Sequence, residues 1–212
     1  MSFFNCNRGE LTPGTISGNP LHGLCEKVCI QVKKVFDACI QQIQQDDLTI
    51  TLSNFMPANP AFPLTFVSAR SITTRGIVTN LTVTRLPERP RFARVRALVN
   101  IPMEVIYVDA NNVEGRADAV IGITVDVILA VPHQSIIPYE VEAVVSAICP
   151  EGTPAGNFQM DVTACITIII KITIETELLV PSYGYCCIPE CEEFTENICS
   201  SFFELPLYPQ SE

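Results

Sequence analysis

Residues 158–180 read FQMDVTACITIIIKITIETELLV, and apolar side chains alternate in them with polar ones. Alternation of this kind is typical of a β-strand, because successive side chains point to opposite faces of a sheet. The even positions that would form the dry face are Phe158, Met160, Val162, Ala164, Ile166, Ile168, Ile170, Ile172 and Ile174. The charged residues inside the stretch argue against a membrane span, so we expect a long strand with one buried face.

The same period of two recurs upstream, and a DANNVEG turn at 109–115 connects two of the runs as a long hairpin. Long antiparallel strands with one dry and one wetter face are typical of a two-layer β-fold. The sequence therefore predicts a mainly β protein, an antiparallel β-sandwich within a domain at 46–182. The expected strands lie at 48–53, 64–86, 93–107, 119–131, 137–147 and 158–180.

Two features of these strands leave alternatives open. Pro102 lies inside a run of strand residues, which indicates a β-bulge or an edge position, since proline has no amide hydrogen to donate. The segment 166–174 would invite pairing with other chains if it formed an open edge. The alternative is a central strand that is paired on both sides.

The ends of the chain differ from its middle. Residues 1–23 are rich in Gly, Pro, Asn and Thr and indicate a flexible arm, and residues 183–212 form an acidic, cysteine-rich tail. The spacing of apolar residues at 24–45 predicts an amphipathic helix, on which Cys25, Cys29 and Cys39 would share one side. Its apolar positions at helical spacing are Val28, Val32, Val35, Phe36, Ile40 and Ile43.

Composition narrows the function classes. Apolar residues make up 48% of the chain and charged residues 17%, so we expect much surface to be buried between subunits or in an insoluble structure. The net charge of −10 argues against nucleic-acid binding. Charge is uneven: seven arginines fall between Arg70 and Arg96, whereas residues 186–212 carry six Glu and no Lys or Arg. We expect no membrane insertion, and the first ten residues do not resemble a secretory signal.

Ten cysteines are the main chemical feature, and most of them flank the expected β-domain. Thiols on arms, helices and tails can reach neighbouring subunits, so we interpret them as disulfide cross-link candidates. A structural zinc site remains an alternative, since Cys25 and Cys29, and Cys187 and Cys191, have ligand spacing. The neighbouring glutamates of the tail disfavour the thiolate form, and unpaired buried thiols are a third alternative. The ten are Cys6, Cys25, Cys29, Cys39, Cys149, Cys165, Cys186, Cys187, Cys191 and Cys199.

Catalytic patterns give no positive reason to expect an enzyme or a cofactor. The two histidines, His22 and His133, have no nucleophile motif around them, and the glycines form no phosphate-binding loop. Asp118, Asp126 and Asp161 fall on the wetter strand faces, where solvated carboxylates are ordinary. We expect a non-catalytic protein.

The hairpin strands at 99–109 and 115–132 resemble the β-domain of spore-coat morphogenetic proteins of clostridia and bacilli, the SPOCS-type domain. The tail with its CCIPECEEF segment is similar to those of cysteine-rich exosporium proteins of clostridial spores. The resemblance covers about residues 95–208. It implies a structural spore-surface protein of the coat or exosporium, made in the mother-cell cytoplasm without a signal peptide and oxidised after assembly.

That resemblance and the cysteines together predict a subunit that assembles with itself, and with other spore-surface proteins, into a disulfide-cross-linked layer or fibre. Two alternatives remain at this stage. One is a zinc- or redox-binding module built on Cys186, Cys187, Cys191 and Cys199. The other is a domain that recruits coat proteins through an apolar sheet face without polymerising.

Overall fold

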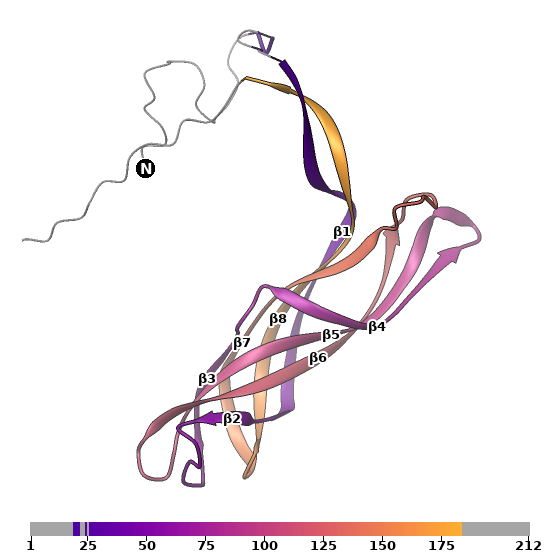
Figure 1. Ribbon diagram of the computed structural model, residues 1–212. Helices are drawn as coiled ribbons and strands as arrows, with labels where there is room; N and C mark the ends of the chain where they lie inside the picture. Colours follow the sequence, from indigo (N-terminus) through magenta and orange to yellow (C-terminus); the bar gives the residue numbers. More distant parts are fainter. Residues whose placement is uncertain (1–18, 22–23, 25, 184–212) are drawn as a thin grey trace, which may run out of the picture. The chain divides into compact units, whose positions relative to one another are not determined.

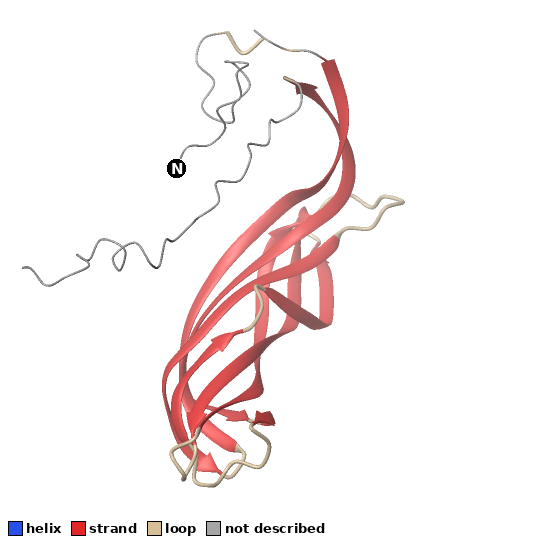
Figure 2. Cartoon of the chain, turned by 60° about the vertical axis from the view of Figure 1, so that its left-hand side comes forward, coloured by secondary structure: helices blue, strands red, loops and turns tan. Residues whose placement is uncertain are grey.

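The computed structural model describes residues 19–21, 24 and 26–183, and this part of the chain contains strands and loops only (Figure 2). It therefore holds no helix long and apolar enough to cross a membrane. The mainly β prediction is confirmed. The strands are β1 (Glu26–Thr51), β2 (Ser53–Met56), β3 (Thr65–Ser71), β4 (Arg75–Leu86), β5 (Arg89–Val108), β6 (Glu114–Ala130), β7 (Glu140–Gly156) and β8 (Gln159–Ser182).

The strands are linked in one sheet in the order β1-β8-β7-β3-β5-β6-β2, and β4 pairs with both β5 and β7. All the pairings from β2 to β8 are antiparallel, as expected. β8, which contains Ile166 and Ile174, lies between β1 and β7, so the central position is correct and the open-edge alternative is wrong. The division into two sandwiched sheets stays a prediction, since hydrogen bonds connect all eight strands.

The predicted helix at 24–45 is wrong, because most of this segment belongs to β1. Its apolar residues fit a helical period, but most are β-branched, and such side chains favour extended backbone. Pairing of β1 with β8 then satisfies the backbone groups and decides the structure. Cys29 and Cys39 consequently lie on a strand rather than on one side of a helix.

The chain divides into two compact units. The first unit comprises residues 1–30 and 179–212, and its described part holds the start of β1 and the end of β8. Within it, the Tyr183 hydroxyl donates a hydrogen bond to the Pro20 carbonyl. The second unit, residues 31–178, holds the rest of β1 and β8 and the whole of β2 to β7 (Figure 1).

The core lies entirely in the second unit and forms one cluster. β5 and β6 contribute their odd positions, whereas β8 contributes even positions from Met160 to Ile172. This is the alternation that the sequence predicts. Apolar residues from strands that are far apart in the sheet order therefore meet in one interior, and their burial supplies the main stabilisation.

The β5–β6 hairpin forms at the predicted turn. Its strands pair without a register shift from Phe92 with Ala130 to Val108 with Glu114. Asp109 organises the turn, since its carboxylate accepts hydrogen bonds from the amides of Asn111 and Val113 and also from that of Ala61. These amides, that of Val113 first, lower the pKa of Asp109.

Pro102 is in neither predicted position, because it lies inside the regular β5–β6 ladder opposite Val120. On its other side, β3 ends at Ser71 and β4 begins at Arg75, so the neighbouring strand is interrupted there. Ile72 in the interruption donates its amide to the Pro102 carbonyl at 3.0 Å. Proline has no amide hydrogen to donate, but at this position the neighbouring strand is interrupted. Few backbone acceptors are therefore left without a donor.

Candidate functional site

Four cysteine thiols lie in the described part of the chain, and all four are free. Cys165 on β8 and Cys29 on β1 are exposed, whereas Cys39 is partly buried and Cys149 is buried. None of these four described cysteines forms a disulfide, so the disulfide cross-links stay a prediction. Cys6, Cys25, Cys186, Cys187, Cys191 and Cys199 lie outside the described residues.

Cys149 and Cys165 are close in the β7–β8 ladder but point to opposite faces. Ile148 pairs with Cys165, so Cys149 is one position away. Cys149 belongs to the core cluster, while Cys165 occupies an outward position of β8. Burial, with a smaller contribution from Cys165, raises the pKa of Cys149 to about 11. Cys149 is thus an inert thiol, and Cys165 is accessible to a partner.

Cys39 packs against the core from β1. Burial is the main cause that raises its pKa, and the carboxylate of Asp37 adds to the effect. Asp37 itself contacts β6, which lies near the opposite end of the strand order, since its Oδ2 accepts a hydrogen bond from the Ala130 amide at 2.7 Å. Cys39 is consequently less available for exchange than Cys165.

The aspartates considered as candidate acids form hydrogen bonds within the fold. No group of three or more His, Cys, Asp or Glu side chains that could hold a metal occurs in the described segments. Asp126 binds Arg94 through two hydrogen bonds, which lower the pKa of its carboxyl. Asp118 accepts from Asn54 at 2.8 Å, and Asp161 accepts from Thr49 at 2.5 Å. His133 is exposed after β6, and His22 is outside the described residues.

The outward face of β5 and β6 carries an apolar patch that the sequence pattern alone did not single out. We define the outer patch as Ile72, Ile77, Pro102 and Val120; the isoleucines and Val120 are 56–60% exposed. Pro102 pairs with Val120, and Ile77 pairs with Asn100 two positions away on β5. The available signal was an apolar residue at the even position 120, on the strand face that also carries Arg116, Asp118 and Thr124.

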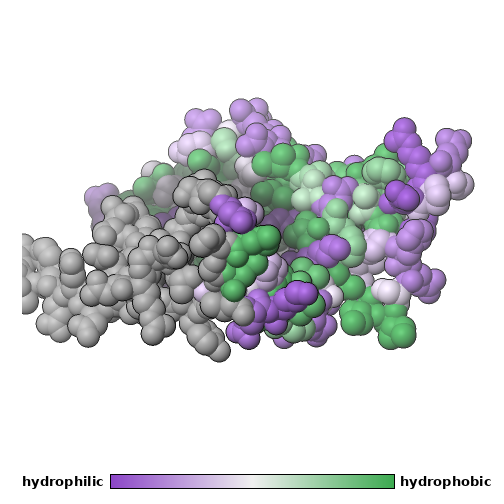
Figure 3. All heavy atoms as spheres, turned by 90° about the horizontal axis from the view of Figure 1, so that it is seen from above, coloured by the Kyte–Doolittle hydropathy of each residue, from purple (hydrophilic) through white to green (hydrophobic). Residues whose placement is uncertain are grey.

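Ion pairs flank this patch on both sides along the strands. On one side, Glu104 binds Arg70 at 3.4 Å and Arg116 at 3.7 Å. On the other, Asp126 binds Arg94 and Arg96. Most of these side chains are well exposed, so each pair adds little stability. Figure 3 likewise shows hydrophobic and hydrophilic residues interspersed on the described surface that faces the viewer.

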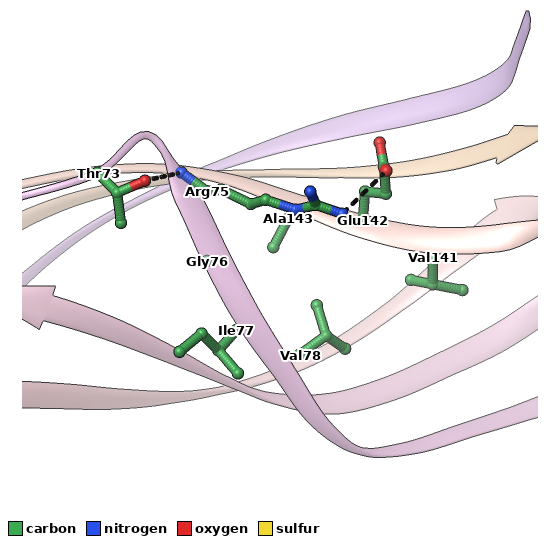
Figure 4. Close-up of a pocket in the computed structure, with 8 residues that line it drawn as sticks. All are labelled: Thr73, Arg75, Gly76, Ile77, Val78, Val141, Glu142 and Ala143. Carbon is green, nitrogen blue, oxygen red and sulfur yellow. Dashed lines mark hydrogen bonds and ion pairs between the residues drawn. The ribbon is translucent and has the colours of Figure 1, made fainter. Parts of the chain in front are cut away.

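A groove of about 430 Å³ opens where β4 leaves β7 (Figure 4). The two strands pair only at Arg75 with Val144 and at Gly76 with Ala143. A Cβ at Gly76 would lie 2.7 Å from the Val145 side chain, so only glycine permits this approach. The groove is lined by Thr73, Arg75, Gly76, Ile77, Val78, Val141, Glu142 and Ala143.

No family model and no solved structure matches this chain. One stretch has a curated relative. Over 63 residues the chain is 44% identical to exosporium protein A of Clostridium sporogenes (strain ATCC 15579). The match covers 26% of this chain and 20% of that protein, so the chain spans about a fifth of the relative that it matches.

Proposed function

We propose that this chain is a non-catalytic structural subunit of the bacterial spore surface, which assembles with itself into a disulfide-cross-linked layer or fibre of the coat or exosporium. The similarity to exosporium protein A carries this proposal. This similarity, over 26% of the chain, supports a related role on the spore surface. Experiment decides the geometry of the assembly.

Features of the second unit support an assembling protein. Its core is a continuous apolar interior that needs no ligand or disulfide. At the same time the outer patch leaves Ile72, Ile77 and Val120 exposed. Exposed apolar groups that are contiguous on a sheet are typical of surfaces that contact other proteins. Burying them between subunits would remove this apolar surface from water.

The thiols divide into two sets that suit cross-linking between subunits. Cys149 is enclosed in the core, while Cys165 and Cys29 are accessible. In the sequence, the tail after β8 adds Cys186, Cys187, Cys191 and Cys199. We propose that the accessible set, together with the arm at 1–23 and the tail at 183–212, forms the bonds between copies. A disulfide between subunits prevents their dissociation as long as it stays oxidised.

The test is electron microscopy of the recombinant full-length chain by negative stain, with gels of boiled samples run with and without reductant. We expect ordered arrays or fibres that release monomer only when reductant is present. Replacing the four tail cysteines by serine should leave a folded protein whose assemblies dissolve in hot detergent alone. Cys149→Ser is the matched control, since a buried thiol cannot reach a neighbour.

Two results would contradict the proposal. A monodisperse small particle that ignores reductant would favour the domain that recruits other proteins without polymerising. Stoichiometric zinc in protein purified under reducing conditions, lost with a chelator, would favour the metal-binding module on the tail cysteines.

A further inference from the structure

The β4 strand has one edge without a partner strand over most of its length. β4 pairs with β5 from Ile77 to Leu86, but on the other side it pairs with β7 only at Arg75 and Gly76. Within the described residues, the edge from Ile77 to Leu86 is therefore unpaired on the β7 side. At the usual rise per residue this edge is about 33 Å long.

This edge lacks the usual protection against strand addition. Edge strands commonly carry charged residues or proline that block another strand. Residues 76–84 read GIVTNLTVT and contain neither a charged residue nor proline. The ladder of β4 with β5 has register shifts near Asn80 and between Arg85 and Leu86, and the rest of it is regular. Ile77 and Leu81 are 56% and 44% exposed, so an added strand would find backbone groups and apolar side chains together.

Unpaired positive charge lies at one end of this edge. At the groove end, Arg75 and Lys33 face the two carboxylates Glu142 and Glu140, with Arg75 3.7 Å from Glu142, so the charges there balance (Figure 4). At the far end, Arg85 donates to the carbonyls of Pro90 and Pro132, which leave its charge uncompensated. Among the described residues, no ion pair neutralises Arg85, Arg89 or Arg91, and Glu88 is the acidic residue between them.

The charges favour one kind of occupant. A second copy of β4, paired antiparallel, would bring the Arg85 side chains close to the Arg75 side chains, and like charges repel. An acidic, strand-forming segment would instead be attracted to the arginines at the Arg85 end. Residues 192–205 read EEFTENICSSFFEL, with four Glu, no Lys or Arg, and no Pro or Gly.

We propose that residues 192–205 of a neighbouring copy add to the free edge of β4, with their glutamates against Arg85, Arg89 and Arg91. The proposal rests on the self-assembly proposed above and names the contact that would drive it before oxidation. The contact is heterologous, because an edge on one copy meets a tail on the next. Such contacts close into rings or propagate as fibres.

The test uses two charge-reversed variants of the full-length chain in reducing buffer, followed by sedimentation velocity. One variant carries Arg89→Glu and Arg91→Glu, and the other carries Glu192→Lys, Glu193→Lys and Glu196→Lys. Each variant alone should associate at least about tenfold more weakly than the wild type, because like charges now face each other. An equimolar mixture should regain association, since the acidic tail of the first variant can bind the basic hairpin of the second.

Two further variants sharpen the result. Leu81→Lys adds a charge to the edge itself and should weaken association without lowering the melting temperature. Arg70→Glu reverses an exposed charge on β3, away from this edge, and should leave association unchanged.

Failure of the mixture to associate, while both variants melt like the wild type, would overturn the proposal. Full association of either variant alone would also overturn it. A wild-type chain that stays monomeric in reductant would exclude this contact. Arrays that form only after oxidation would in that case still support the cross-linked layer, so the two proposals can fail separately.

Discussion

At the scale of single residues, accessibility decides the chemistry of the thiols more than their number does. Cys149 and Cys165 are near neighbours in the β7–β8 ladder, yet one faces the core and the other faces solvent. A thiol buried among apolar side chains resists ionisation, and the thiolate is the form that reacts. The alternation of strand faces therefore separates a structural cysteine from a reactive one.

We accordingly expect an alkylating reagent at neutral pH to label Cys165 in the folded chain and to leave Cys149 unmodified. The reason is that Cys149 is buried and its pKa is raised to about 11. Peptide mapping by mass spectrometry measures both sites in one sample. The denatured chain is the control, in which both should react. Equal labelling of the two sites in the folded chain would contradict the placement.

Gly115 offers a second test at this scale, because it lies against the ring of Tyr107. A Cβ at this position would be 2.5 Å from the ring carbon Cζ, and the ring is fully buried. We expect Gly115→Ala to destabilise the fold by about 1–3 kcal/mol through overpacking. Denaturant unfolding gives the value.

Gly122→Ala on the same strand is its matched control. The nearest atoms to a Cβ there are 3.4 Å away, so its effect should stay within about 0.5 kcal/mol. Similar losses for both variants would show that the tight contact with Tyr107 does not matter.

At the scale of elements, β8 is the strand that holds the sheet and the core together. It lies between β1 and β7, and its even positions from Met160 to Ile172 are buried. β5 likewise has strands on both sides, β6 on one and β3 and β4 on the other. Gly76 permits β4 to approach β5 closely. The long strands thus serve a single core, and their outward faces remain available for contacts.

Shortening a buried side chain of β8 should therefore be costly. We expect Ile170→Ala to lower the free energy of unfolding by about 2–5 kcal/mol, from lost burial and the cavity left behind. Ile148→Ala on the adjacent strand is the comparison, since Ile148 is 55% exposed, and its effect should stay within about 0.5 kcal/mol. Chemical denaturation measures both. A small loss at Ile170 would mean that this side of the core packs loosely.

At the scale of the whole molecule, the second unit folds around an apolar core, without disulfides among its described cysteines. The core of the second unit consists of apolar side chains, and the four thiols of the described part are free. Cysteines in this arrangement do not hold the fold together. Of these four, Cys29 and Cys165 are exposed and stay accessible to neighbours after folding, which suits the proposal of a protein that folds under reducing conditions and is oxidised later.

We therefore expect reductant to change the stability of assemblies but not of the folded subunit. The melting temperature of the protein, kept below assembling concentrations, should shift by less than about 2 °C when a reductant is added. Differential scanning calorimetry of matched samples with and without reductant measures this. A fall of many degrees would reveal a disulfide within the subunit that stabilises its fold.

Local alternation in the sequence was enough to predict the strands β5, β6 and β8, their buried faces and the turn at Asp109. These features depend on side-chain period and turn chemistry, which are properties of neighbouring residues. The exposed position of Cys165 follows from the same alternation. The sequence also predicted a structural, cysteine-bearing protein, for which the match to exosporium protein A gives partial support.

Only the tertiary structure decided the rest, because it depends on residues that are distant in the chain. Residues 24–45 fit a helix by period, yet β1 forms a strand because β8 offers it hydrogen-bond partners. The place of Pro102 depends on the interruption between β3 and β4, and the free edge of β4 depends on its departure from β7 after Gly76. Pairing between distant strands leaves no local signal in the sequence, so partners and edges emerge only when the sheet is assembled.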